Sequence, residues 1–284
     1  MKTTDREFER LRDYMYNKYG INLSQKRVLI EGRLSAMLVQ RGYTNFDKYI
    51  DDVIADRSGH EVSLLVSKLT TNFTYFLREQ GHYDFLKEFV LKPIKEGNGK
   101  RSLKIWSAAS SSGEEPYSIA LVVTDFFGLG STVQTSIRAS DISDHVLSMA
   151  REGAYTEDRV TQLPKPWIAK YFKKRADGMY VVDDSIKRMV SYQYFNLNDN
   201  IGWQKNVYDV LFCRNVMIYF DRPTRQALVS RLYDSIAPGG YLFIGMSESL
   251  INLDTKFKYI KPSIYQKVDE KTMPSNANIR RINK

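Results

Sequence analysis

The segment that most constrains how this chain folds is residues 104–121, KIWSAASSSGEEPYSIAL. It reads as a short buried strand, a turn of small residues and a helix. Small residues let a ligand approach the backbone closely, yet the segment has neither the GxGxxG nor the P-loop pattern. Glu114 and Glu115 open the helix, where they would repel the phosphate that a helix N-terminus otherwise attracts. The segment therefore predicts a cradle for a ligand with positive charge or hydroxyl groups.

Strand and helix patterns alternate through the domain predicted at residues 100–268. Apolar runs predict strands at 103–107, 133–140, 189–195, 208–213 and 241–246. Helical patterns lie between them at 115–127, 143–152 and 223–237, the last stopped by Pro238, Gly239 and Gly240. Residues 257–260 and 264–268 predict a hairpin. This alternation predicts an α/β fold with a doubly wound, mostly parallel sheet and an antiparallel edge strand.

Three other regions lack this alternation. Residues 1–90 predict an all-α domain, with helices at 5–19, 24–40, 45–55 and 60–68, and the next helix at 82–95. Ser24 is the predicted N-cap of the second of these helices. Residues 154–190 predict an inserted β-subdomain in which 178–182 pairs with 186–190. Residues 269–284 carry no pattern and predict a disordered tail.

The composition limits the class of protein. No apolar run among the 284 residues reaches the roughly 20 needed to span a membrane, and the charged N-terminus lacks a secretory signal pattern. The single cysteine, Cys213, excludes an internal disulfide. We therefore expect a soluble cytoplasmic protein without membrane insertion. The net charge of +9 suits an acidic partner, but no nucleic-acid-binding motif accompanies it, so the charge is either a docking surface or a solvated face.

Polar side chains follow the predicted strands at the ends where α/β sheets bind ligands. Asp141 ends the second strand, where an acid commonly binds two ribose hydroxyls, although it could instead cap the next helix. Asn196 both donates and accepts hydrogen bonds and, beside Leu197, suits a purine edge. Ribose and purine without a pyrophosphate cradle indicate S-adenosylmethionine rather than a dinucleotide.

Further features concern single side chains and the basic second helix. The segment 70–79, TTNFTYFLRE, places Arg78 after aromatic residues, where an arginine is often a surface side chain. The second helix carries Lys26, Arg27 and Arg33, either as a solvated face or as a docking surface for an acidic helical partner. The three histidines have no metal-ligand spacing, so no metal is expected, and Cys213 reads as a packing residue.

Taken together, the motifs resemble the CheR family of chemotaxis receptor methyltransferases. The segments that carry this resemblance are TNFTYFLR, IWSAASSSGEEPYSIAL, ASDIS, FNL, FCRNVMIYFD and APGGYLFIGMSESL, in the family's order. The resemblance covers about residues 5–268. It implies a helical receptor-docking domain, followed by a class I, Rossmann-like methyltransferase fold with a small β-subdomain. It also implies transfer of the methyl group of S-adenosylmethionine to receptor glutamates, giving methyl esters and S-adenosylhomocysteine in chemotactic adaptation.

The same resemblance implies site residues, carried over position by position. Arg78 and Tyr219 match the residues that position the reacting groups. The implied cofactor-binding residues are Asn72, Thr74, Arg78, Glu115, Asp141, Asn196, Leu197, Cys213 and Arg214. Lys26, Arg27 and Arg33 match the element that meets the receptor's acidic methylation helices. The loop at 173–178 looks too short for the insertion with which some members bind a receptor pentapeptide, so pentapeptide-independent action is expected.

The implied chemistry needs no catalytic base. A glutamate carboxylate is already ionised at neutral pH, so the enzyme has to align it with the methyl group and strip its water. The missing Ser/His/Asp or Cys/His set is consistent with this. Two alternatives remain at this stage: a non-catalytic signalling module that binds S-adenosylmethionine, and an RNA methyltransferase suggested by the charge alone.

Overall fold

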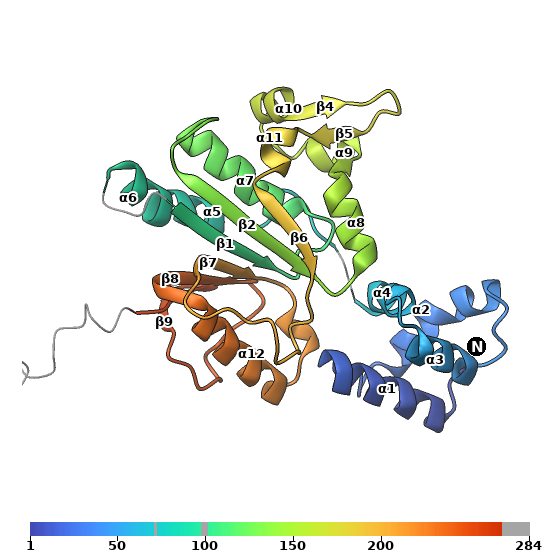
Figure 1. Ribbon diagram of the computed structural model, residues 1–284. Helices are drawn as coiled ribbons and strands as arrows, with labels where there is room; N and C mark the ends of the chain where they lie inside the picture. Colours follow the sequence, from blue (N-terminus) through green and yellow to red (C-terminus); the bar gives the residue numbers. More distant parts are fainter. Residues whose placement is uncertain (71–72, 98–101, 269–284) are drawn as a thin grey trace, which may run out of the picture.

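The computed structural model describes residues 1–70, 73–97 and 102–268. Within these ranges, four helices form an N-terminal domain, a seven-stranded sheet lies at the centre, and a three-stranded sheet forms a smaller unit, as Figure 1 shows. Asn72 and the predicted tail at 269–284 lie outside the described residues.

The N-terminal helices follow the apolar spacing of the sequence: α1 (Asp5–Tyr19), α2 (Arg27–Gln40), α3 (Phe46–Ala55) and α4 (His60–Leu69). A capping box starts α1, because the side chain of Thr4 and that of Glu7 each accept a hydrogen bond from the other's N–H. Gly20, with a φ of 70°, ends it. The prediction of Ser24 as N-cap is wrong: its N–H donates to the Asn22 side chain, which closes a turn before α2 begins.

The central sheet is mostly parallel with an antiparallel edge, as predicted. Its strand order is β6 (Val190–Tyr194), β2 (Gln134–Asp141), β1 (Ser102–Ala108), β7 (Tyr208–Cys213), β8 (Ile236–Ile244), β10 (Ile264–Gln266) and β9 (Lys258–Lys261). β10 pairs antiparallel with both β8 and β9. The strand order reverses between β1 and β7, which is where such sheets bind ligands.

Alternate side chains of the central strands pack on opposite faces of the sheet. Along β1, Ile105 belongs to one hydrophobic core and Trp106 to the other, and Phe212 and Cys213 divide in the same way along β7. The first face is covered by α7 (Glu114–Phe127), α5 (Gly81–Phe85) and the π-helical η1 (Leu86–Leu91). The second face is covered by α12 (Arg222–Ser235). Burial of both faces confirms the doubly wound arrangement.

The helices that follow residue 73 pack with the sheet rather than with α1–α4. Phe76, Tyr83 and Leu91 are buried in the same core as Ile105, whereas the buried core of the N-terminal domain ends at Leu69. α6 (Lys92–Lys95) continues η1. We expected residues up to about 90 to belong to the N-terminal domain, because a helix pattern does not show which core it joins. We infer from the packing that the boundary lies near residue 70.

The inserted β-subdomain exists, but its predicted pairing is wrong. Its strand order is β3 (Ala154–Tyr155), β5 (Tyr180–Val182) and β4 (Phe172–Lys174), all antiparallel. The short helices around it are α9 (Glu157–Val160), α10 (Lys165–Tyr171) and α11 (Asp184–Lys187), and α8 (Asp144–Glu152) precedes it. Asp183 caps α11 by accepting a hydrogen bond from the Ser185 N–H, so Ile186 enters a helix and the sheet core instead of a strand.

The Pro238–Gly239–Gly240 sequence lies within β8 and does not stop a helix. α12 already ends at Ser235, and β8 runs from Ile236 beside β7 with a register shift opposite Tyr208 and Val210. A Cβ on Gly240 would lie 2.7 Å from the carbonyl oxygen of Asp209, so a side chain there would collide with the neighbouring strand. The glycine therefore permits close strand approach.

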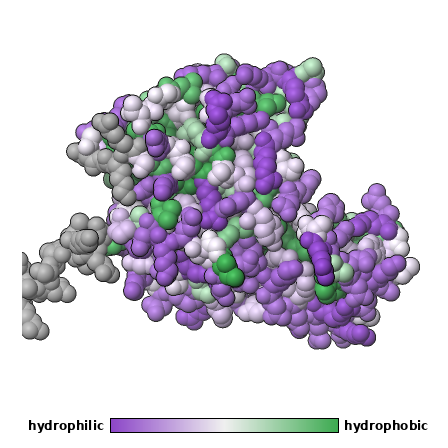
Figure 2. All heavy atoms as spheres, in the orientation of Figure 1, coloured by the Kyte–Doolittle hydropathy of each residue, from purple (hydrophilic) through white to green (hydrophobic). Residues whose placement is uncertain are grey.

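The surface is mostly hydrophilic on the face seen in Figure 2, where hydrophobic atoms form small, separate spots. None of the helices in the described part of the chain is both long and apolar enough to cross a membrane.

Candidate active site

A cleft lies at the carboxyl ends of β1, β2, β6 and β7, with residues of the N-terminal domain on one side. The predicted site residues that line it are Thr74, Arg78, Glu115, Asp141, Asn196, Leu197, Arg214 and Tyr219. The predicted site residues that do not line it are Lys26, Arg27, Arg33 and Cys213. The fold thus brings together side chains from widely separated parts of the chain at the expected edge of the sheet.

The turn after β1 has a strained backbone and buried hydroxyls that lack partners. Ala109 and Ser111 have φ angles of 61° and 49°, in the left-handed region that L residues seldom adopt. A Cβ on Gly113 would lie 2.8 Å from the Tyr155 hydroxyl oxygen, so this position requires glycine. Within the described residues, the hydroxyls of Ser110 and Ser111 have no hydrogen-bond partner. Buried hydroxyls are normally paired, so these two fit a polar ligand in the cleft.

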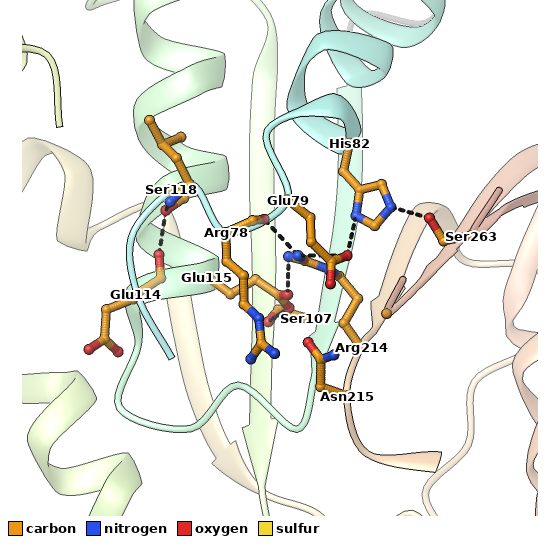
Figure 3. Close-up of polar contacts among 12 residues, drawn as sticks. Arg78, Glu79, His82, Ser107, Glu114, Glu115, Ser118, Arg214, Asn215 and Ser263 are labelled. Carbon is orange, nitrogen blue, oxygen red and sulfur yellow. Dashed lines mark hydrogen bonds and ion pairs between the residues drawn. The ribbon is translucent and has the colours of Figure 1, made fainter. Parts of the chain in front are cut away.

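Glu115 and Arg214 form the charged centre of the cleft wall, shown in Figure 3. Arg214 Nη1 lies 2.8 Å from Glu115 Oε2, and Ser107 donates to Glu115 Oε1 at 2.7 Å. The Arg214 side chain is 2% exposed and that of Glu115 is 13% exposed. Burial lowers the pKa of Arg214, but the charges of Glu115 and Glu79 help to raise it overall, so the guanidinium stays charged. Arg214 therefore acts from within the wall and orients the Glu115 carboxylate.

Arg78 lies on a loop whose backbone is held in an unusual conformation. Leu77 and Glu79, on either side of it, have φ angles of 57° and 59°, and each such residue costs on the order of 1 kcal/mol. Ser118 of α7 accepts a hydrogen bond from the Leu77 N–H at 2.9 Å. The Arg78 guanidinium donates to the Phe73 carbonyl at 2.8 Å and, in Figure 3, points away from Arg214. Strain of this kind is characteristic of functional loops.

Glu114 turns away from the cleft. Its side chain is fully buried, pairs with the Arg159 guanidinium of the β-subdomain, and accepts a hydrogen bond from Ser112 at 2.7 Å. Figure 3 shows it pointing away from Glu115 and Arg214. Burial raises its pKa, and Ser112 and Arg159 oppose that shift. Glu114 thus ties α7 to the β-subdomain, while Glu115 faces the ligand cleft.

Asp141 lines the cleft at the end of β2. Its carboxylate accepts hydrogen bonds from the N–H groups of Ser111 at 2.9 Å and of Ser143 at 3.0 Å. Burial raises the pKa of this carboxyl overall, and these two hydrogen bonds oppose part of the rise. Asp141 lines the cleft and binds the backbone that leads into the next helix, but the alternative reading of Asp141 as the cap of that helix is wrong. Ser143, not Asp141, caps α8.

Asn196 and Leu197 line the cleft, but the Asn196 side chain is already engaged. Its amide nitrogen donates to the Lys18 carbonyl at 2.8 Å and to Asp199 at 2.9 Å, and its oxygen accepts from the Asn198 N–H at 3.0 Å. The expectation that its amide N–H groups meet a purine edge is therefore not supported, because both N–H donors are used. The local sequence could not show this, since Lys18 lies in the other domain.

Cys213 does not form part of the cleft wall, in contrast to the expectation from family resemblance. It is fully buried on the α12 side of β7. Burial raises its pKa well above the ordinary value, with smaller contributions from Glu248 and Glu115, so the thiol stays protonated. Its packing role, inferred from the apolar strand, agrees with this position.

Residues of the helical domain complete the cleft and were missed in the sequence. Tyr19 and Ile21 line it, and Ile21 forms a β-bridge with Phe220. The Asn22 N–H donates to the Tyr219 carbonyl at 2.8 Å, so the segment after α1 holds the short 3₁₀ helix η2 (Met217–Tyr219) in place. No local pattern indicates such a contact between segments about 200 residues apart.

The basic residues of α2 lie outside the cleft lining. Arg27 pairs with Asp5 at 2.5 Å, and Arg33 donates to the Thr70 carbonyl at 3.2 Å, where Thr70 itself lines the cleft. Lys26 is exposed at the start of the helix. Two of the three predicted partner-binding residues thus also stabilise the domain and its junction.

Comparison with known proteins agrees with this arrangement. Residues 6–70 match the all-alpha domain of CheR methyltransferases, and residues 72–266 match the CheR methyltransferase SAM-binding domain. A chemotaxis protein methyltransferase of Borreliella burgdorferi is 40% identical, over 93% of this chain and 95% of that protein. Chemotaxis protein methyltransferase 2 of Vibrio cholerae is 38% identical, over 89% of each chain. A third, from Escherichia coli, is 32% identical over 92% of this chain and 91% of that protein.

Fold, cleft and comparisons define a methyltransferase that uses S-adenosylmethionine. The chain belongs to the CheR methyltransferase family.

The cleft residues fit this cofactor. Glu115 offers negative charge to an ammonium or sulfonium group, and Asp141 can accept hydrogen bonds from ribose hydroxyls. The unpartnered Ser110 and Ser111 hydroxyls can donate to a carboxylate group. In the part of the chain that the structure describes, no cluster of three His, Cys, Asp or Glu side chains could hold a metal ion.

Proposed function

We propose that this protein transfers the methyl group of S-adenosylmethionine to glutamate side chains on the cytoplasmic helices of chemotaxis receptors. The observation that carries the proposal is the Arg78 guanidinium at a cleft with Glu115 and Asp141 in its wall. The names of the relatives, chemotaxis protein methyltransferases, support the receptor as substrate. The product would be a glutamate methyl ester, which makes the protein a protein-glutamate O-methyltransferase.

Arg78 and Tyr219 would position the substrate. A receptor carboxylate is ionised at neutral pH and needs no base. Bound S-adenosylmethionine would supply an electrophilic methyl on sulfur. A carboxylate oxygen would form the new C–O bond while the C–S bond breaks and a neutral thioether leaves. The Arg78 guanidinium would hold the carboxylate by charge-assisted hydrogen bonds, and the Tyr219 hydroxyl would orient it. The walls of the cleft would remove part of the water around the nucleophile.

The remaining cleft residues would hold the cofactor. Glu115 would face its ammonium group, Asp141 its ribose hydroxyls, and Leu197 the apolar face of its adenine. Thr74 lies on the Arg78 loop and lines the same cleft. Asn72 stays a prediction outside the described residues.

We further propose that α2 and its N-cap residue meet the acidic methylation helices through Lys26, Arg27 and Arg33, of which Lys26 and Arg33 are exposed. Pentapeptide-independent action is supported by the tight turn between β4 and β5, where the Arg175 N–H donates to the Met179 carbonyl at 2.7 Å. Arg175 also pairs with Asp177 at the same turn, and Lys173 pairs with Asp183 at 2.9 Å. The side chains of Arg175 and Lys173 therefore already form ion pairs with carboxylates of the same chain.

The test is incubation of purified protein with methyl-labelled S-adenosylmethionine and receptor-containing membranes. Base-labile label on receptor glutamates is expected, with turnover reduced at least 100-fold in Arg78→Ala and unchanged in the exposed control Arg57→Ala. Cofactor binding without any label on the receptor would favour a non-catalytic signalling module instead. Label in RNA but not in receptor would show that the substrate class is wrong.

A further inference from the structure

Glu79 follows Arg78 directly and lies at the centre of a buried polar network, shown in Figure 3. Its side chain is 16% exposed, and one carboxylate oxygen, Oε2, lies 3.1 Å from Arg214 Nη2. The other oxygen accepts a hydrogen bond from the Met246 N–H at 3.2 Å. The backbone of Glu79 is left-handed, with a φ of 59°. These contacts hold a residue in a conformation that the loop would not adopt on its own.

Arg214 connects the Glu79 carboxylate to the Arg78 loop and to the cleft wall. Its Nη2 also donates to the Arg78 carbonyl at 2.6 Å, while its Nη1 pairs with Glu115 at 2.8 Å. One guanidinium thus binds the backbone of Arg78, the side chain of its neighbour Glu79, and a carboxylate of the cleft. The contacts of Arg214 with the Glu115 carboxylate and the Arg78 carbonyl are charge-assisted hydrogen bonds, which are stronger than neutral ones, and its contact with Glu79 is an ion pair.

The network continues to the edge of the sheet. His82, one turn after Glu79, is 3% exposed, and its Nε2 lies 2.6 Å from the Ser263 hydroxyl in the turn between β9 and β10. Met246, whose N–H binds Glu79, directly follows the end of β8. The Arg78 loop is therefore tied to the rigid sheet from two sides, although Arg78 itself points away from these anchors.

We propose that Glu79 is a positioning residue for methyl transfer: through Arg214 it holds the loop that aims the Arg78 guanidinium at the substrate carboxylate. The inference rests on the proposed function. A side-chain amide at position 79 carries no charge, and its single oxygen replaces only one of the two acceptors that the carboxylate presents to Arg214 Nη2 and to the Met246 N–H. The loop backbone at Glu79 then relaxes from its left-handed conformation, and the Arg78 side chain loses its fixed direction. Glu115 and Asp141 keep their places in the cleft wall.

The experiment compares Glu79→Gln and Glu79→Asn with wild type and with Glu88→Gln, an exposed glutamate on η1 that pairs with Lys92. Asn tolerates left-handed backbone and serves as the variant least prone to misfolding. Both Glu79 variants are expected to lower kcat for receptor methylation about tenfold or more, without changing the KM for S-adenosylmethionine. Their affinity for S-adenosylhomocysteine by calorimetry stays within about threefold of wild type, and Glu88→Gln is unchanged.

A double-mutant cycle with Arg78→Ala tests whether Glu79 acts through Arg78. If Glu79 acts through Arg78, adding Glu79→Gln to Arg78→Ala lowers kcat by less than about threefold. Equal effects in both backgrounds would overturn the proposal, as would unchanged kcat in both Glu79 variants. A fall in S-adenosylhomocysteine affinity as large as the fall in kcat would make Glu79 part of the cofactor site instead.

Hydrogen exchange tests the role of Glu79 independently of the proposed methyl transfer. Amide exchange of residues 75–80 is expected to rise in Glu79→Gln and Glu79→Asn, and to stay unchanged in Glu88→Gln, with no substrate present. Wild-type protein that leaves receptors unmethylated would refute the proposed function, while exchange still reports whether Glu79 holds the loop. Unaltered exchange in both Glu79 variants would refute the positioning role whatever the substrate.

Discussion

Glu114 and Glu115 are neighbours in the chain but point to different partners: Glu115 pairs with Arg214 at 2.8 Å in the cleft wall, and Glu114 pairs with Arg159 of the β-subdomain. Successive residues of a helix point about 100° apart, so one carboxylate can face the ligand while the next one joins two parts of the fold. The pair is therefore divided between the wall of the cleft and the contact with the β-subdomain.

This division predicts different outcomes for the same substitution at the two positions. Glu115→Gln is expected to weaken S-adenosylmethionine binding by about tenfold to 100-fold, because it removes a negative charge that faces a cationic ligand. Glu114→Gln is expected to leave binding within about threefold of wild type, because its side chain lies outside the cleft. Isothermal titration of both variants provides the measurement, and equal losses would show that the assignment of the two glutamates is wrong.

Asp141→Asn is expected to reduce S-adenosylhomocysteine affinity about tenfold. The amide keeps one acceptor oxygen for the Ser111 or Ser143 N–H, so the turn is expected to survive. Unlike the carboxylate, the amide could not accept hydrogen bonds from both ribose hydroxyls in the proposed contact. The matched control is Asp144→Asn, an exposed carboxylate in the first turn of α8. Calorimetric affinities checked against thermal melting test this prediction; a normal affinity for Asp141→Asn would remove Asp141 from the cofactor site.

Cys213 is expected to resist alkylation in the folded protein. The thiol is fully buried, and burial raises its pKa, so it is neither accessible nor ionised near neutral pH. Iodoacetamide should modify it only after denaturation, which intact mass spectrometry reads unambiguously in a chain with one cysteine. Cys213→Ala should keep S-adenosylhomocysteine affinity; a large loss of affinity, in a variant that melts normally, would restore Cys213 to the cofactor site.

His82 predicts a loss of stability in acid. Burial, together with the charges of Arg214 and Lys261, lowers its pKa to about 3, whereas the unfolded chain titrates near 6.5. Between these values the unfolded state binds a proton that the folded state excludes, so the free energy of unfolding falls as the pH falls. The expected loss is about 2 kcal/mol from pH 7 to pH 5.

His82→Gln, whose side-chain amide can still reach Ser263, should remove this part of the pH dependence. Denaturant unfolding of wild type and variant at each pH measures the difference, with the exposed His145→Asn as control. Parallel curves for wild type and His82→Gln would mean that His82 protonates normally in the folded state.

Much of the fold followed from local patterns. Local spacing of apolar residues predicts which side chains are buried. Examples are Ile105 and Trp106, which alternate between two cores, and the apolar spacing of α1 and α7. The parallel sheet and its ligand-binding edge follow from that alternation, because parallel strands joined by helices end at the same edge. Asp141 and Glu115 were therefore predictable as cleft residues.

Other features depended on contacts between distant segments, which no local period encodes. Tyr19 and Ile21 line the cleft because the end of α1 pairs with the segment around Phe220, and Asn196 is occupied because Lys18 reaches it from the other domain. The pairing of β5 with β3 and β4 likewise joins segments that are separated along the chain.

The sequence alone determined the alternation of strand and helix, the cradle of small residues after β1, and the two carboxylates that open α7. The tertiary structure alone decided which carboxylate faces the ligand, and that Arg214 joins Glu115 to the Arg78 loop. The physical reason is that periodicity records whether a side chain is buried, whereas the partner it meets there depends on the packing of the whole chain.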